Sequence, residues 1–208
     1  MSDGDFAYWW SAPGEWVEPP NERRDGWSGM MRVVTAGRLY YVKRQRNHLC
    51  RTLRHPFGWP TASREWHYLQ RLRALGVAAP VPVFHQARKG DQGIEAVLVT
   101  EELEGFSDLA HQADLSPTRR RRLASVLGER LGVLHHARLQ HSSLYDKHIM
   151  VRWDADEPVV ALIDLEKMRQ RLTARGAAGH DLEQLRRRQK LFDDGDWSSL
   201  LAAHDARL

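Results

Sequence analysis

The segment from Ser116 to Asp164 limits the fold more than any other part of the chain. Ser116 followed by Pro117 is typical of a helix start, because a serine side chain caps free N–H groups and proline suits the first turn. Apolar residues then recur at helical spacing and predict one long helix with a single apolar face: Leu123, Val126, Leu127, Leu131 and Leu134. This helix leads directly into the polar loop HSSLYDKHIMV, residues 141–151.

A β-hairpin is predicted immediately after this loop. The apolar segments IMVRW and VVALID are separated by a turn at residues 154–158, and their side chains alternate as a half-buried ribbon requires. Asp164 follows the second segment, so we expect its carboxylate to project out of the core.

The N-terminal half combines strands with one helix. The stretch MMRVVTAGRLYYVKR, residues 30–44, predicts two strands joined around Ala36 and Gly37. Residues 61–75 show helical spacing of apolar side chains, with Gly76 placed to end the helix, and residues 94–103 form a short apolar strand.

Two further regions complete the organisation of the chain. Residues 1–28 are rich in Trp, Pro and Gly without sustained periodicity, and we interpret them as an extension that packs through its aromatic side chains. Residues 180–192 and 196–206 predict two more helices. The order of elements is that of an α+β, two-lobed, protein-kinase-like fold.

The predicted lobes share a single kinase-like domain that spans residues 1–208. A small β-rich N-terminal lobe with one helix takes up about residues 29–103. A mainly helical C-terminal lobe with a β-hairpin takes up about residues 104–208.

Composition and net charge limit which binding partners and which cellular compartment we expect for this chain. The formal net charge of +4 favours anionic partners such as phosphates, acidic sugars or nucleic acid, but the chain has no recognition-helix or aromatic-platform motif, so no nucleic acid is expected. Cys50 is the only cysteine, which excludes an intramolecular disulfide. Without an 18-residue apolar run or a signal sequence, we predict a cytoplasmic protein, with peripheral inner-membrane contact through Trp9 and Trp10 as a further possibility.

A phosphoryl-transfer site needs a cation on the phosphates, a backbone cradle, carboxylates for magnesium and a group that orients the acceptor hydroxyl. Lys43 ends an apolar and aromatic strand, and Glu65 on the following helix is placed to pair with it. Gly26 and Gly29, in GWSGMMRV, predict a turn that covers phosphates with backbone N–H groups, although two glycines before a strand are usually only a turn.

Carboxylates near the end of the second hairpin are the metal-binding candidates. If the chain stays extended beyond Asp164, Glu166 points to the same side and supplies a second oxygen for magnesium; otherwise it pairs with a neighbouring basic residue. Asp146, further along the polar loop, is a candidate replacement base.

The motifs YYVKRQ, REWHYLQRL, HSSLYDKHIMV, LIDLEKMR and HDLEQLRRR together resemble the lipopolysaccharide kinase (Kdo/WaaP) family, and most of all its InaA-like branch. The resemblance implies ATP with Mg2+ and a sugar hydroxyl of the lipopolysaccharide inner core as acceptor. It also implies that Lys43 holds phosphate with Glu65 as its partner, and that Asp164 binds metal.

Three further roles are implied only by this resemblance. His148 stands where protein kinases carry a metal-binding asparagine, and His141 is the structural histidine that opens the catalytic loop. Asp181 supports that loop from the next helix.

Ser143 departs from the kinase pattern, because it occupies the position of the catalytic aspartate. A serine hydroxyl does not accept a proton at pH 7 as a carboxylate does, so general-base assistance of about 10²- to 10⁴-fold is missing. The chain is therefore either a phosphotransferase that manages without its usual base, or a pseudokinase with a nucleotide-binding, scaffold or stress-response role.

Overall fold

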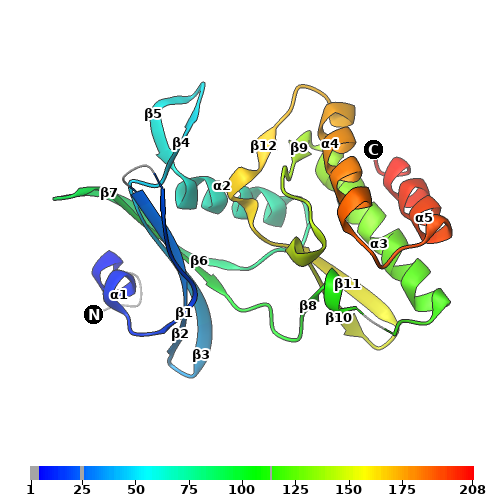
Figure 1. Cartoon of the computed structure of the whole chain (residues 1–208), viewed down its shortest axis with the longest axis horizontal. Coiled ribbons are helices and arrows are strands. Elements are labelled where there is room, and N and C mark those ends of the chain that lie inside the picture. Colours follow the sequence, from blue (N-terminus) through cyan, green and yellow to red (C-terminus); the bar gives the residue numbers. More distant parts are fainter. Residues whose placement is uncertain (1–4, 24–25, 113) are drawn as a thin grey trace. The chain divides into compact units, whose positions relative to one another are not determined.

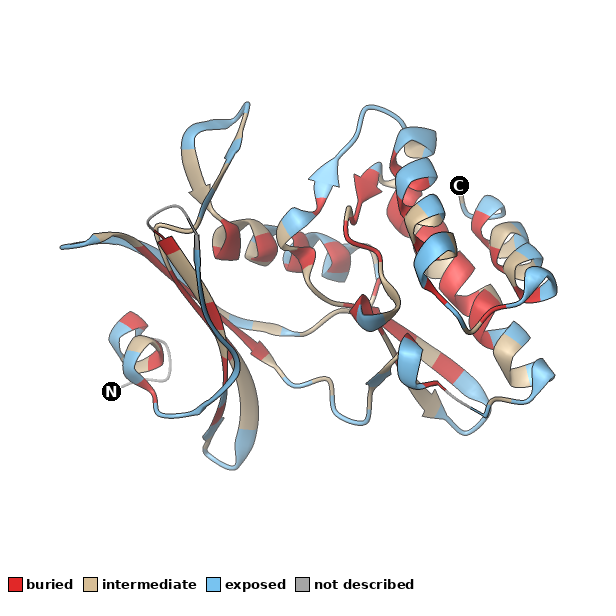
Figure 2. Cartoon of the chain, viewed as in Figure 1, coloured by how far each residue is buried: buried red, intermediate tan, exposed pale blue. Residues whose placement is uncertain are grey.

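The computed structural model describes residues 5–23, 26–112 and 114–208, which form two compact units. The first unit contains residues up to Gln70 and residues Pro80–Glu102, and the second contains residues Arg71–Ala79 and Leu103–Leu208. Each unit has its own buried core, and the two are described separately (Figures 1 and 2).

The first unit is built on a five-stranded antiparallel sheet with the order β1-β2-β3-β7-β6 (Figure 1). Its strands are β1 (Glu15–Arg23), β2 (Gly26–Thr35), β3 (Arg38–Arg46), β6 (Pro82–Gly90) and β7 (Gly93–Glu101). A separate hairpin, β4 (Leu49–Thr52) with β5 (His55–Pro60), precedes helix α2 (Thr61–Ala74). The predicted turn at Ala36 and Gly37, the strand near residues 94–103 and the helix over 61–75 are all confirmed.

The N-terminal segment contributes more regular structure than its sequence predicts. Helix α1 (Phe6–Ser11) packs on the sheet through Phe6 and Trp9, which are 2% and 1% exposed. Residues 15–23 and 26–28, predicted as part of an irregular extension, are instead strand. Pairing with β2 stabilises β1 although prolines and register shifts interrupt its alternation, and a pattern search cannot detect such partner-dependent structure.

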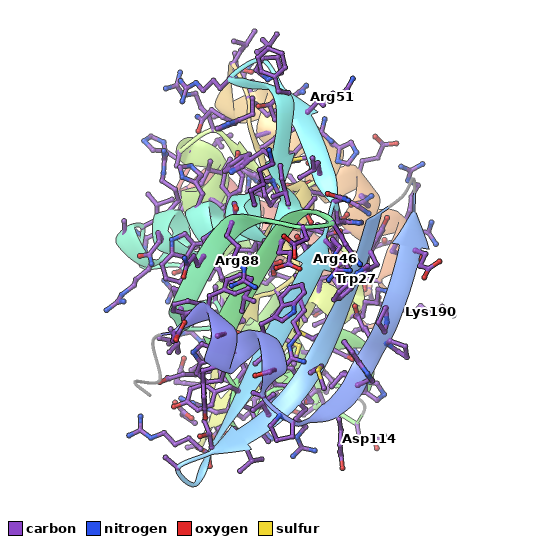
Figure 3. The ribbon with its side chains drawn as sticks, turned by 90° about the vertical axis from the view of Figure 1, so that its left-hand side faces the viewer. Trp27, Arg46, Arg51, Arg88, Asp114 and Lys190 are labelled. Atoms are coloured by element: carbon purple, nitrogen blue, oxygen red, sulfur yellow. The ribbon has the colours of Figure 1, made fainter. Side chains whose placement is uncertain are left out.

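Buried Arg44 ties α1 to the sheet. Its Nε donates to the Trp9 carbonyl oxygen at 3.0 Å and its Nη2 donates to the Ala12 carbonyl oxygen at 2.6 Å. Arg88 of β6 also contacts α1, because its guanidinium lies 3.9 Å from the centroid of the Phe6 ring. Figure 3 labels Arg88 near this helix.

The second unit is mainly helical. It contains α3 (Pro117–His136), α4 (Ala174–Arg188) and α5 (Asp194–Asp205), with the short helices η1 (Leu109–His111), η2 (Asp146–His148) and η3 (Leu165–Lys167). Strands β10 (Ile149–Asp154), β11 (Glu157–Leu162) and β8 (Ser107–Asp108) form one small sheet, and β9 (Leu139–Gln140) pairs with β12 (Arg169–Gln170). The predicted long helix and second hairpin are confirmed.

Two sequence expectations for this unit need correction. Helix α4 begins at Ala174, six residues before the predicted start, because the Thr173 hydroxyl accepts a hydrogen bond from the Gly176 N–H at 3.0 Å and caps it. Residues 107–111, between the strand predicted over 94–103 and the predicted long helix, lack a periodic pattern in the sequence but form β8 and η1.

Helices α3 and α5 approach closely at two glycines. A Cβ atom at Gly128 would lie 2.2 Å from the Leu200 carbonyl oxygen, and one at Gly132 would lie 2.6 Å from the His204 carbonyl oxygen. The helix backbones are therefore nearly in contact, and α3 must carry glycine where α5 crosses it.

Replacing Arg44 with alanine is expected to lower the free energy of unfolding by about 2 to 4 kcal/mol, because the change removes buried hydrogen bonds to two carbonyl groups of the α1 region. The measurement is urea unfolding monitored by tryptophan fluorescence. The matched control is Arg38→Ala, whose side chain is 74% exposed and should matter by less than about 0.5 kcal/mol. Equal stability of the two variants would show that Arg44 does not anchor α1.

Candidate active site

The candidate functional residues of the first unit centre on a buried ion pair. Lys43 on β3 donates from Nζ to Oε2 of Glu65 on α2 at 2.5 Å, and the two side chains are 8% and 10% exposed. Sequence reasoning predicted this pair, and the structure brings the two residues together. Since a buried charge without a partner is costly, each residue holds the other in its charged form.

Gln45 fixes the same two elements two residues further along β3. Its Nε2 donates to the Thr61 hydroxyl at 2.7 Å, and its Oε1 accepts the Ala62 N–H at 2.8 Å. Strand β3 and the first turn of α2 are thus joined beside the ion pair, which sets the distance between Lys43 and Glu65. Sequence analysis missed Gln45, because a lone glutamine among basic residues carries no distinctive signal.

The two glycines proposed as a phosphate cradle do not form a turn. Gly26 and Gly29 lie within β2, where Gly26 pairs with Arg23 of β1 and Gly29 pairs with Arg44 of β3. A Cβ at Gly29 would lie 2.6 Å from the Trp16 ring, and one at Gly26 would lie 2.5 Å from the Asn47 carbonyl oxygen. Close packing of neighbouring segments accounts for both glycines, so the predicted turn is wrong.

The candidate functional residues of the second unit are organised by Asp181 of α4. This residue is fully buried, and its Oδ2 accepts the His141 N–H at 2.6 Å while its Oδ1 accepts the Ser142 N–H at 2.9 Å. Ser142 has a φ of 70°, a conformation that costs energy for a residue other than glycine. Asp181 therefore holds the polar loop in a strained shape, as its predicted supporting role requires.

A histidine pair continues this network toward α5. His135 of α3 is fully buried, with Nε2 3.3 Å from Oδ2 of Asp181 and Nδ1 2.9 Å from Nε2 of His204. The Nδ1 atom of His204 in turn lies 2.9 Å from Oδ1 of Asp205. Sequence reasoning missed this connection, although a histidine next to Leu134 on the apolar helix face was a detectable signal.

Burial and hydrogen bonding shift the pKa values of the network. Burial by itself raises the pKa of Asp181, but the His135 hydrogen bond, the nearby His135 and His141 rings and the Ser142 N–H outweigh it, so this pKa lies below its ordinary value. Burial lowers the pKa of His135 and of His141, against the opposing influence of Asp181. Both histidines are therefore neutral at pH 7.

His141 links the polar loop to the segment before Asp164. Its Nδ1 accepts the Ser143 N–H at 3.3 Å and its Nε2 donates to the Ile163 carbonyl oxygen at 2.9 Å. This geometry defines the neutral Nε2–H tautomer and places the loop against the end of the β10–β11 hairpin.

His148 and Asp164 form the part of the site that suits a metal ion. His148 donates from Nδ1 to the Ser143 carbonyl oxygen at 2.7 Å, and its Nε2 lies 3.3 Å from Oδ2 of Asp164. Asp164 is in the left-handed region at φ 59° and its side chain is 31% exposed. Adjacent ligands of an octahedral Mg2+ lie about 3 Å apart, so His148 and Asp164 would be the residues that hold such a cation, which would neutralise charge on bound phosphates.

Glu166 does not follow Asp164 on an extended chain. Residues 165–167 form the short helix η3, so the expectation that both carboxylates point to one side because of strand alternation is wrong. Within residues 5–23, 26–112 and 114–208, no three His, Cys, Asp or Glu side chains come together as a preformed metal site. Of the three predicted metal ligands, the structure brings together only His148 and Asp164.

Ser143, at the position of the missing catalytic aspartate, and Asp146, the candidate replacement base, differ in exposure. Ser143 is 1% exposed, and its backbone groups bond to His141 and His148. Asp146 begins η2 and lines a pocket of about 190 Å³ with the neighbouring residues Gln112, Gln189 and Lys190. Asp146 is therefore the loop carboxylate that a small molecule can reach.

These features define a protein-kinase-like class: a β-rich unit with a buried lysine–glutamate pair, and a helical unit with a supported polar loop and an aspartate after a hairpin. Comparison with solved structures supports this class. The structure of WaaP in complex with acyl carrier protein is similar with a TM-score of 0.76 and 23% identity, over 98% of this chain and 83% of that chain. A Rio2 kinase complex with ADP, Mg2+ and phosphoaspartate from Chaetomium thermophilum gives a TM-score of 0.55 and 15% identity, over 92% and 66% of the two chains.

The chain belongs to the lipopolysaccharide kinase (Kdo/WaaP) family, whose sequence model matches residues 7–204. Protein InaA of Escherichia coli (strain K12) is 35% identical over 208 residues, which cover 97% of this chain and 96% of that protein. The resemblance drawn from the five sequence motifs is therefore confirmed. None of the helices among the described residues is long and apolar enough to cross a membrane.

Asp181→Asn is expected to lower the free energy of unfolding by about 2 to 4 kcal/mol at pH 7, because the loop N–H groups lose a charged acceptor. The folded-state pKa of Asp181 is depressed, so its contribution is present above the ordinary aspartate pKa of about 3.9 and is lost as pH falls through the lower, folded value. Urea unfolding between pH 3 and pH 7 measures this difference.

The control for this prediction is Glu183→Gln on the same helix, since its side chain is 68% exposed and its ion pair with Arg187 is a surface pair. It should match the wild type within about 0.5 kcal/mol. A pH-independent difference for Asp181→Asn would contradict the assigned charge state.

Proposed function

We propose that this protein is an ATP-dependent phosphotransferase whose acceptor is a sugar hydroxyl of the lipopolysaccharide inner core or a related small substrate. The observation that carries the proposal is the buried ion pair between Lys43 and Glu65, at 2.5 Å. A lysine and a glutamate that served only solubility would lie on the surface, whereas a buried pair in the β-rich unit is what holds nucleotide phosphates in kinases. Membership of the lipopolysaccharide kinase family and a net charge of +4 support an anionic acceptor.

Each residue of the site has a defined part in this proposal. Lys43 binds phosphate oxygens of ATP, and Glu65 keeps its ammonium group in place. Asp164 and His148 supply two ligands for Mg2+, which when bound neutralises charge on the phosphates. His141 and Asp181 position the loop backbone and do not contact the substrate.

The absence of a carboxylate at position 143 slows this reaction but does not exclude it. The transition state of phosphoryl transfer is loose, and most of the rate enhancement comes from positioning and charge neutralisation. Asp146, which reaches a pocket in the same unit, is the candidate that accepts the acceptor proton.

A pseudokinase is the second candidate function, and the burial of Ser143 favours it. At 1% exposure this hydroxyl is enclosed by the loop, and it offers no carboxylate that accepts a proton. A protein that binds nucleotide for a scaffold or stress-response role needs Lys43, Glu65 and Asp164 but no base.

Magnesium-dependent ATP turnover with core oligosaccharide separates the two functions. For a working kinase, Asp164→Asn should reduce kcat at least about 100-fold, because a metal ligand is lost, and Ser143→Asp should raise kcat about 10- to 100-fold by restoring a base. Binding of ATP without turnover in the wild type, together with activity in Ser143→Asp, would instead establish the pseudokinase.

Lys43→Met is expected to weaken ATP binding at least about tenfold, since one charge-assisted phosphate contact is lost. The measurement is the shift in melting temperature against ATP concentration, which reports affinity without requiring turnover. Lys89→Met is the control, because this exposed lysine lies on β6 of the same unit. Unchanged ATP affinity in Lys43→Met would remove the basis of both candidate functions.

A further inference from the structure

The hairpin formed by β4 and β5 has no evident role in the first unit's fold. It forms its own two-stranded sheet, separate from the five-stranded one, and each of its residues from 49 to 60 is exposed or half-buried (Figure 2). Its base is closed by Gln45, which binds both Thr61 and Ala62. The hairpin contacts α2 through Trp59, whose ring lies 5.9 Å from that of His67, while its residues 53–57 are exposed.

Large apolar side chains lie at the tip of this hairpin. Leu53, in the two-residue turn, is 103% exposed, and Phe57 on β5 is 95% exposed. These are the two highest exposed fractions among the large hydrophobic side chains of the described residues. Two such exposed side chains in one short hairpin are typical of a surface that binds another molecule or a membrane.

The charge of the hairpin has one sign. Residues 47–64 contain Arg51, Arg54 and Arg64 but no aspartate or glutamate, although the whole chain has 27 acidic residues. Arg51 and Arg54 are exposed and flank Leu53, and neither forms an ion pair with any described residue. Figure 3 shows Arg51 on this hairpin, away from the aromatic and basic cluster around Trp27 and Arg46.

We propose that the β4–β5 hairpin docks the protein on an anionic lipid bilayer. Leu53 and Phe57 enter the boundary between headgroups and acyl chains, while Arg51 and Arg54 contact lipid phosphates. Exposed Leu53 and Phe57 next to exposed Arg51 and Arg54 fit this boundary, because it brings acyl chains and anionic headgroups close together. This inference is independent of the proposed phosphotransferase activity.

The N-terminal tryptophans, which the sequence offered for membrane contact, are occupied by the fold. Trp9 is 1% exposed in the core of the first unit, and the Trp10 ring stacks on Phe6 with centroids 5.4 Å apart. Among the exposed large hydrophobic side chains described in the first unit, those of the hairpin, Leu53 and Phe57, are the most exposed.

Vesicle sedimentation with the full chain tests the proposal. We expect binding to vesicles of phosphatidylcholine with 30% phosphatidylglycerol, no binding to phosphatidylcholine alone, and loss of binding at high salt. Leu53→Ser combined with Phe57→Ser should weaken binding at least about tenfold. Its matched control is Val34→Ser with Leu172→Ser, which removes two side chains that are 67% and 93% exposed elsewhere.

The charge contribution has a separate variant pair. Arg51→Gln with Arg54→Gln should weaken binding about 25-fold at low salt, since each arginine near an anionic surface is worth about fivefold. The control is Arg71→Gln with Arg73→Gln, which removes two exposed arginines near the end of α2 and changes the net charge equally. Equal losses in the two variants would overturn the proposal, because net charge alone would then explain binding.

Insertion can also be observed directly, because Cys50 is the only cysteine. In a Cys50→Ser background, an environment-sensitive fluorophore attached at Leu53→Cys should shift to the blue with anionic vesicles, whereas one attached at Leu172→Cys should not. An unshifted Leu53 label, or full vesicle binding by Leu53→Ser with Phe57→Ser, would overturn the proposal. Binding of a single-stranded RNA in place of anionic vesicles would overturn it as well.

Discussion

The polar loop of the second unit keeps its shape because one buried carboxylate, Asp181, accepts hydrogen bonds from two successive backbone N–H groups. Without that acceptor the loop would leave buried donors unpaired and a strained residue, Ser142, unsupported. The positions of His141 and His148 follow from this shape, and His148 in turn lies against Asp164. The position of His148 beside Asp164 therefore depends on Asp181 of α4, whose carboxylate bonds to the loop backbone and to His135.

The same carboxylate connects the loop to the packing of the helices. Asp181 reaches His135 on α3, which reaches His204 on α5, and the glycines of α3 allow α5 to approach closely enough for the two rings to meet. Buried polar groups of this kind are stable only when every member has a partner. The network thus links the contact between α3 and α5 to the geometry of the polar loop at His141 and Ser142.

Elements with strong local signals could be predicted from the sequence. The long helix from Pro117, the second hairpin and the helix that carries Glu65 all have a clear period, a cap or a turn, and the partnership of Lys43 with Glu65 follows from the order of strand and helix. Strand β1 and the η3 turn at Glu166 could not be predicted, because pairing with a neighbour and the left-handed conformation of Asp164 decide them. The roles of Gln45 and His135 likewise require tertiary contacts that no local pattern records.

The bridge that Gln45 forms at the base of the β4–β5 hairpin has a consequence for how the family can vary. Because Gln45 joins the end of β3 to the start of α2, the segment between them is a closed loop whose length and composition hardly affect the lysine–glutamate pair. The entropy of closing such a loop grows only slowly with its length. Relatives can therefore change the length and charge of this hairpin during evolution while the geometry of the lysine–glutamate pair is inherited intact.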